Sequence, residues 1–92
     1  MQSKFEKFEL GKIVATPGVI DKVPNSTWVT ALARHAKGDW GNMPPEDVTA
    51  NNEALQDVGR LMSSYLTPEG TEFWIITEAD RSVTTILLPE EY

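Results

Sequence analysis

The sequence predicts an α+β domain: an N-terminal strand, two helices, and then a three-stranded antiparallel meander with the helices packed on one face. Two observations predict this class. Residues 59–92 contain three β-rich runs separated by two turns, which is typical of a meander. Before them, residues 28–37 and 45–58 carry apolar side chains at helical spacing. A length of 92 residues fits a single domain, in which we expect residues 1–9 to be a flexible N-terminal segment.

The N-terminal strand is expected at Leu10–Val14, as a short strand suited to a sheet edge. It ends near Pro17, because proline has no backbone N–H to donate to a strand ladder. Residues 18–23 then favour a helical turn that stops before Pro24.

The first of the two helices follows three residues, 25–27, that are good N-caps. Trp28, Leu32 and His35 share one face of this helix, which indicates the side that packs on the sheet. Gly38 suits the position just after the helix, where a left-handed backbone is common.

The second helix is expected to begin with Pro45 at its first position and to run to about Val58. Glu46 and Asp47 fall in its first turn, where the helix dipole favours negative charge. Gly59 ends it.

The meander is predicted as strands at Leu61–Leu66, Glu72–Glu78 and Val83–Leu88, with a type I turn at residues 67–70. Both faces of the second and third strands are largely apolar. One face packs on the helices, so the other needs cover from the N-terminal segment or from a second molecule.

Charge is distributed unevenly along the chain. Residues 1–38 hold six Lys/Arg against three Asp/Glu, and residues 39–92 hold two Arg against eleven Asp/Glu, which gives +3 and −9 and sums to the net −6. An acidic surface repels phosphate backbones, so we do not expect a nucleic-acid partner. The acidic half is either a solvated face that keeps the protein soluble or a patch that docks on a protein partner with a basic surface.

Several functional classes are not expected. The chain has no cysteine and one histidine, so we expect no disulfide, no metal site built on cysteine or several histidines, and no cofactor. No apolar run approaches the length of a membrane span. The N-terminus lacks a signal-peptide core, and a cytoplasmic protein is the expectation.

His35 with the nearby Asp39 has the residue types of a general-base pair. His35 also lies on the packing face of its helix, where a structural role is the alternative. Trp40 either closes the core over Gly41 or binds a ligand.

Asp80, Arg81 and Ser82 are predicted at a hairpin tip. One interpretation is an Asx turn, in which the Asp80 carboxylate accepts backbone N–H groups. In the other, the Arg81 guanidinium clamps an internal carboxylate or binds a phosphate or a partner's carboxylate. Thr84 or Thr85 should lie at the same end of the sheet. The candidate binding residues are therefore Asp39, Trp40, Asp80, Arg81 and Thr84.

The chain ends in Glu90, Glu91 and Tyr92. These residues form either a fraying acidic tail or a short docking tail with an aromatic anchor.

The segments Ile-Val-Ala-Thr-Pro-Gly, Leu-Ala-Arg-His with Gly-Asp-Trp-Gly, and Trp74–Tyr92 resemble a family of small bacterial proteins called plasmid-related, which occur on plasmids and integrated elements. The resemblance extends from Gly11 to the C-terminus and is strongest in the last twenty residues. It implies an association with mobile genetic elements and brings no catalytic residues.

The leading hypothesis is a non-enzymatic, mobile-element-associated protein that binds a protein partner through its acidic surface. The alternative is a small nuclease: helices before an antiparallel meander look like the core of barnase-like and messenger-RNA-interferase toxins. His35, Arg81 and Tyr65 would then be the catalytic residues by type. The acidic charge of this chain departs from that of such toxins. A third hypothesis is a homodimer that uses the uncovered sheet face.

Overall fold

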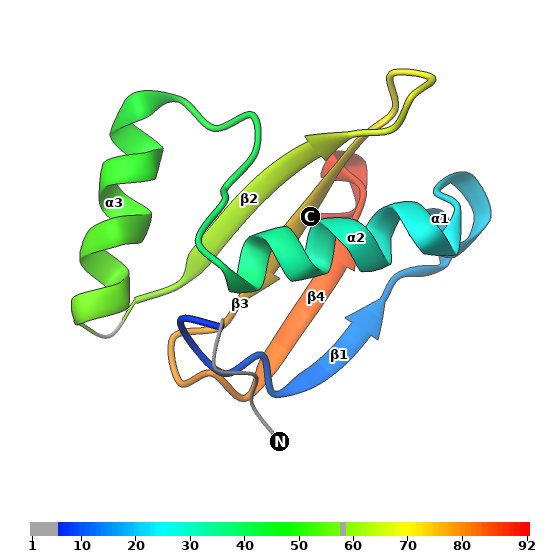
Figure 1. Ribbon diagram of the computed structural model, residues 1–92. Helices are drawn as coiled ribbons and strands as arrows, with labels where there is room; N and C mark the ends of the chain where they lie inside the picture. The colour runs from blue at the N-terminus through cyan, green and yellow to red at the C-terminus, as the bar shows by residue number, and fades with distance from the viewer. Residues whose placement is uncertain (1–5, 58) are drawn as a thin grey trace.

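A computed structural model of the protein describes residues 6–57 and 59–92 (Figure 1). The α+β class is confirmed. The strands are β1 (Lys12–Ala15), β2 (Leu61–Leu66), β3 (Glu72–Thr77) and β4 (Val83–Leu87). The helices are α1 (Pro17–Lys22), α2 (Asn25–Ala36), α3 (Pro45–Gln56) and a short 3₁₀ helix, η1 (Pro89–Glu91). The expected end of the second helix at Val58 lies outside the described residues.

In the part of the chain that the structure describes, the sheet has four strands in the order β1-β4-β3-β2. Strands β2, β3 and β4 pair antiparallel, and β1 joins β4 in parallel, with Val14 opposite Thr85. The prediction of a sheet made of a three-stranded meander was therefore incomplete. The reason is that β1 and β4 lie at opposite ends of the chain, and no local turn pattern marks such a pairing.

Residues 6–57 and 59–92 contain three α-helices where the sequence predicted two. Residues 17–22 form a complete short helix because Thr16 caps it, its hydroxyl accepting the N–H of Val19 at 3.4 Å. Residues 25–27, which the sequence predicted as N-caps, form the first turn of α2 itself. Pro24, with an extended ψ of 141°, precedes its first turn, and the Asn25 side chain accepts the indole N–H of Trp28 at 3.2 Å.

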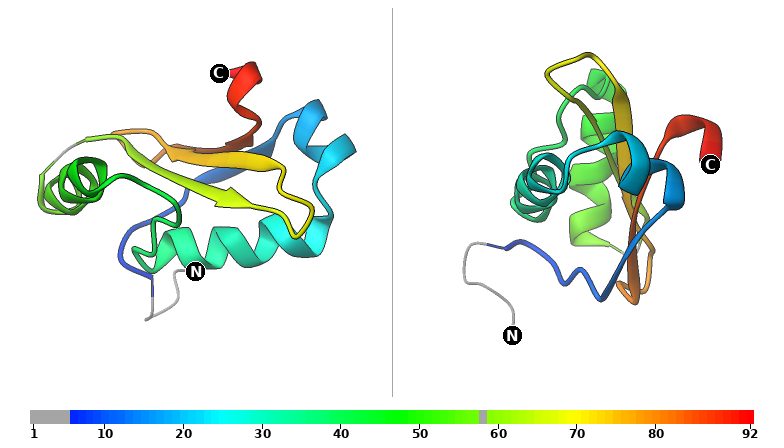
Figure 2. Two further views of the ribbon diagram at one scale, coloured as in Figure 1. Left: turned by 90° about the horizontal axis from the view of Figure 1, so that it is seen from above. Right: turned by 90° about the vertical axis from the view of Figure 1, so that its right-hand side faces the viewer.

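Helices α2 and α3 lie on one face of the sheet, and η1 lies on the other (Figure 2). The main core forms between α2 and the sheet, and it contains Val19, Val23, Ala31, Tyr65, Phe73, Ile75, Ile86 and Leu88. The opposite face is covered in part by the C-terminal segment, since Tyr92 packs edge-on against Trp74 with ring centroids 5.8 Å apart. That cover comes from neither of the two sources that the sequence suggested.

A second cluster joins the N-terminal segment to the fold. Phe8 is 7% exposed and packs with Trp40 and Leu61. Within the segment that the sequence predicted to be flexible, residues 1–9, the Phe8 ring therefore fills space beside α2. Residues 1–5 lie outside the described residues.

The outer edge of β2 is occupied by side-chain and loop groups. Asn51 of α3 donates its amide to the Met62 carbonyl at 2.7 Å and accepts the Met62 N–H at 3.1 Å. The N–H of Ser64 donates to the Trp40 carbonyl at 3.2 Å, and its carbonyl accepts the Asn42 N–H at 2.7 Å. These contacts satisfy the backbone groups that an edge strand normally leaves free, and they attach α3 to the sheet.

Replacing Asn51 with alanine is expected to lower the free energy of unfolding by about 2 kcal/mol, because two hydrogen bonds to one partly buried peptide unit are lost. Urea unfolding measures this change. Asn52→Ala is the comparison, since Asn52 makes one bond, from the Trp40 indole at 3.1 Å. An Asn51 variant no less stable than the Asn52 variant would contradict this role.

Candidate functional site

His35 lies in the core at the centre of a buried polar network. It is fully buried, and its Nδ1 and Nε2 form hydrogen bonds with the hydroxyls of Ser63 and Thr77, the latter at 2.9 Å. Thr77 bonds to Thr84 at 2.7 Å, and the Thr84 hydroxyl donates to the Leu10 carbonyl at 2.7 Å. The network links α2, three strands and the N-terminal segment through satisfied groups, as buried polar groups require.

Burial lowers the pKa of His35 from an ordinary 6.5 to about 3. The ring is enclosed by aromatic edges, with centroids at 5.3 Å from Phe8 and 5.5 Å from Trp40. The imidazole is therefore neutral at physiological pH, and it is not exposed to solvent. It does not form the general-base pair with Asp39.

Trp40 is 4% exposed and belongs to the cluster with Phe8 and Leu61. Gly41, which follows it, has a φ of 70° and lies against β2: a Cβ there would approach the Ser64 carbonyl oxygen to 2.1 Å. This close approach allows Trp40 to close the core. Of the two roles that the sequence left open for Trp40, its position fits closing the core over Gly41.

Asp39 forms a bidentate ion pair with Arg34, at 2.7 and 3.1 Å. The hydrogen bond from Arg34 lowers the pKa of the Asp39 carboxyl. Arg34 also lies over the Tyr65 ring, 4.9 Å from its centroid, and the Tyr65 hydroxyl donates to the Asp39 carbonyl at 2.6 Å. Burial raises the pKa of Tyr65 to about 12, so its phenol stays protonated and serves as a structural donor.

The hairpin tip is an Asx turn. The Asp80 carboxylate accepts the N–H of Ser82 at 3.0 Å and its hydroxyl at 2.6 Å, and the hydrogen bond from the hydroxyl lowers the pKa of Asp80. Arg81 adopts a left-handed φ of 61°. This conformation is unfavourable for a residue with a side chain, so other interactions of Arg81 must offset its cost.

The Arg81 guanidinium binds backbone carbonyls. It donates to the Gly59 carbonyl at 2.6 Å and to the Ala54 carbonyl at 2.9 Å, and it lies 5.8 Å from the centroid of the Phe8 ring. Ala54 is in the last turn of α3, whose carbonyls have no partner within the helix. Arg81 therefore caps α3 and does not clamp a carboxylate. Thr84, the predicted binding residue on β4, is buried.

The nuclease alternative requires His35, Arg81 and Tyr65 to meet in one open cleft. The structure engages each of them in a separate structural contact, two of them in the core. A surface pocket beside Tyr65 is lined by Arg34 and hydroxyls of α2 but not by His35 or Arg81. Among residues 6–57 and 59–92, no group of three His, Asp or Glu side chains could hold a metal ion.

Helix α3 carries a cluster of exposed acidic side chains. It exposes Glu46, Asp47 and Glu53, and Asp57 follows at its C-cap. The ion pairs found among the described residues are Lys22–Glu90, Arg34–Asp39 and Arg60–Glu78, so none of these four acids is in one. We call these four residues the acidic α3 surface. The absence of Lys and Arg from residues 41–59 was the sequence signal for it.

The C-terminal residues are fixed rather than frayed. The Glu91 carboxylate accepts the Thr16 hydroxyl, the Gly18 N–H at 3.0 Å and the Leu88 N–H at 2.9 Å, and the bond from Thr16 lowers its pKa. Tyr92 remains 69% exposed and accepts a hydrogen bond from Arg60 at 2.9 Å.

Comparison with known proteins leaves the function to be argued from this geometry. No family model matches the chain, and no curated protein or solved structure is significantly similar to it. None of the helices in the described part of the chain is both long and apolar enough to cross a bilayer.

Proposed function

We propose that this protein is a non-enzymatic, mobile-element-associated binding module that docks on a basic protein through the acidic α3 surface. The observation that carries the proposal is the contrast between two sets of polar residues. The residue types suited to catalysis are buried or bonded to backbone, whereas the α3 acids are exposed and take part in no ion pair within residues 6–57 and 59–92.

The position of α3 supports a docking role. The helix lies beside β2, at the end of the sheet away from β1 (Figure 1). Asn51 and Arg81 hold its inner side, so the outer side can bind without rearranging the core. Three carboxylates on α3 and a fourth at its C-cap produce a negative potential that steers a basic partner and repels nucleic acid.

The test is retention of partners from a nuclease-treated bacterial lysate by three baits: the wild-type protein, Glu46→Gln/Asp47→Asn/Glu53→Gln, and the control Glu9→Gln/Asp21→Asn/Glu69→Gln. The control removes the same number and kind of charges from exposed positions elsewhere. We expect a protein that the wild type and the control retain and that the α3 variant loses by about tenfold or more. Circular dichroism checks that the α3 variant is folded.

Salt provides the second arm of this test. The Debye length falls from about 10 Å at 0.1 M to about 3 Å at 1 M ionic strength, so a complex formed by the acidic α3 surface should dissociate at high salt. Retention of the same proteins by all three baits, unchanged by salt, would rule the proposal out.

A further inference from the structure

The two edges of the sheet differ in how their backbone groups are used. The β2 edge is occupied by Asn51 and by residues 40–42. On β1, the N–H groups of Lys12 and Thr16 donate to β4, at 2.9 and 3.0 Å. Alternate residues of a strand direct their backbone groups to the same side. The backbone N–H and C=O groups of Ile13 and Ala15 therefore point away from β4. No strand in the described part of the chain lies on that side.

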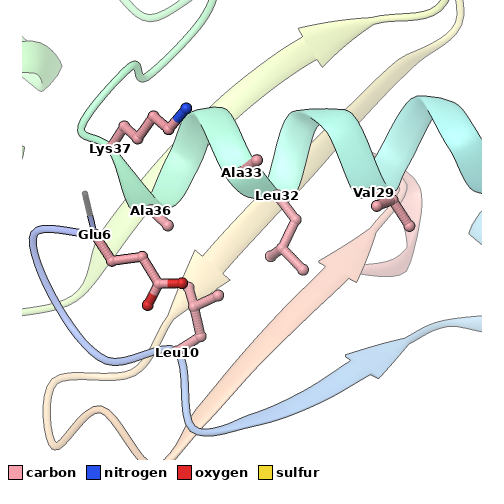
Figure 3. A pocket seen from close by; sticks show the side chains of 7 residues that line it. All are labelled: Glu6, Leu10, Val29, Leu32, Ala33, Ala36 and Lys37. Atoms are coloured by element: carbon pink, nitrogen blue, oxygen red, sulfur yellow. The ribbon is translucent and has the colours of Figure 1, made fainter. Parts of the chain in front are cut away.

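Apolar surface accompanies this open edge. Ile13 is 39% exposed, Val14 37% and Val29 52%. Between α2 and the N-terminal segment lies a groove of about 340 Å³ (Figure 3). Its lining is mostly aliphatic: Leu10, Val29, Leu32, Ala33 and Ala36, with Glu6 and Lys37 at the rim. An unpaired edge beside exposed aliphatic side chains is suited to receive another strand.

We propose that the occupant is a second copy of this chain, with β1 paired antiparallel to β1 about a two-fold axis at Val14. In this register Ile13 lies opposite Ala15 of the second copy, and each such pair exchanges two backbone hydrogen bonds. The two four-stranded sheets then become continuous. Such an interface is self-complementary, as a two-fold dimer requires.

Charge complementarity favours a second copy over a foreign strand. The same register places Lys12 opposite Thr16 of the second copy, on the same face of the joined sheet. The Thr16 hydroxyl is bonded to the Glu91 carboxylate, so each Lys12 ammonium meets a carboxylate of the other chain, twice by symmetry. An edge lysine normally discourages pairing, but in this arrangement it has a partner.

The same two-fold pairing of the two copies also covers the exposed apolar side chains. The two-fold axis stands perpendicular to the sheet, so both α2 helices and both grooves lie on one face, on either side of the axis. Ile13 and Val29 of each copy then approach those of the other, and Val14 meets Val14 on the opposite face. The acidic α3 surfaces lie at the two outer ends, so the dimer does not depend on the proposed function.

The first measurement is mass by light scattering from micromolar to millimolar concentration. We expect a rise from 10.3 kDa towards twice that value. Amide hydrogen exchange locates the interface: the N–H groups of Ile13 and Ala15 should slow as the dimer forms, while that of Glu69, in an exposed turn, should not. A monomer at every concentration overturns the proposal, and so does a dimer in which both edge amides still exchange fast.

Two variants test the contacts. Lys12→Glu places like charges opposite each other and should raise the dimer Kd by about tenfold, whereas Lys7→Glu, the same change at another exposed lysine, should not.

Ala15→Pro removes an outward N–H and should abolish dimers; if this variant fails to fold, Lys12→Glu still decides. An unchanged Kd in Lys12→Glu overturns the register, and an extended peptide that binds a monomeric protein at this edge overturns the choice of occupant.

Discussion

Lowering the pH from about 7 to about 5 is expected to reduce the free energy of unfolding by about 2 kcal/mol, because of His35 alone. Its pKa is about 3 in the folded protein and near 6.5 when exposed. Between these two pH values the unfolded chain binds one more proton at His35 than the folded protein does. The stability that comes from the neutral His35 is therefore fully present above about pH 6.5 and is lost as the pH falls towards about 3. His35 is the only histidine, and urea unfolding at several pH values measures the slope.

The matched variant is His35→Gln, which keeps a polar side chain able to bond to Ser63 and Thr77 but does not titrate. We expect it to be less stable than the wild type near neutral pH, since the amide fills the ring's place incompletely. Between about pH 7 and 5 its stability should be nearly constant, because ordinary carboxyl groups titrate lower. A variant with the wild-type slope would show that His35 is not the titrating group.

This prediction also separates the two interpretations of His35 that the sequence left open. The helical spacing with Trp28 and Leu32 placed His35 correctly on the inner face of α2. Its partners could not be found in the same way, because Ser63 and Thr77 come from distant strands and their register is set by the folded sheet. A histidine's chemistry depends on that environment, which periodicity alone does not describe.

The fold shows the same division between local and distant information. Strand β3 and its turn from β2 were predicted because Pro68 and Gly70 mark that turn, which the Gly70 N–H closes on the Thr67 carbonyl at 2.9 Å. The pairing of β1 with β4 has no comparable marker. It depends on Gly11, whose φ of 66° favours glycine and whose backbone passes so close to the β3–β4 hairpin that a Cβ there would lie 2.3–2.5 Å from backbone atoms of Arg81 and Ser82.

Arg81 was predicted as a binding residue because it is a cation in the acidic half of the chain. In the structure its charge instead binds backbone carbonyls of the same chain. Its guanidinium satisfies carbonyls at the end of α3 and at Gly59. A sequence pattern could not have assigned these acceptors, since backbone carbonyls are present at every position. The consequence is that Arg81 supports the acidic α3 surface indirectly, by fixing the helix that carries it.

Replacing Arg81 with alanine is therefore expected to lower the free energy of unfolding by about 2–3 kcal/mol, since charge-assisted hydrogen bonds to two partly buried carbonyls are lost. Arg81→Lys should recover only part of this loss, because a single ammonium group cannot span the Gly59 and Ala54 carbonyls as the planar guanidinium does. Chemical unfolding of the three proteins gives the comparison.

Arg81→Gly distinguishes the side chain from the backbone. Glycine loses the same hydrogen bonds as alanine but adopts the φ of 61° without steric cost, so it should be more stable than Arg81→Ala by about 1 kcal/mol. Hydrogen exchange should show faster opening of α3 in both variants, with β3 and β4 less affected. If α3 instead stays protected in both while binding to the basic partner is lost, Arg81 contacts the partner directly, and the capping role derived from its hydrogen bonds is wrong.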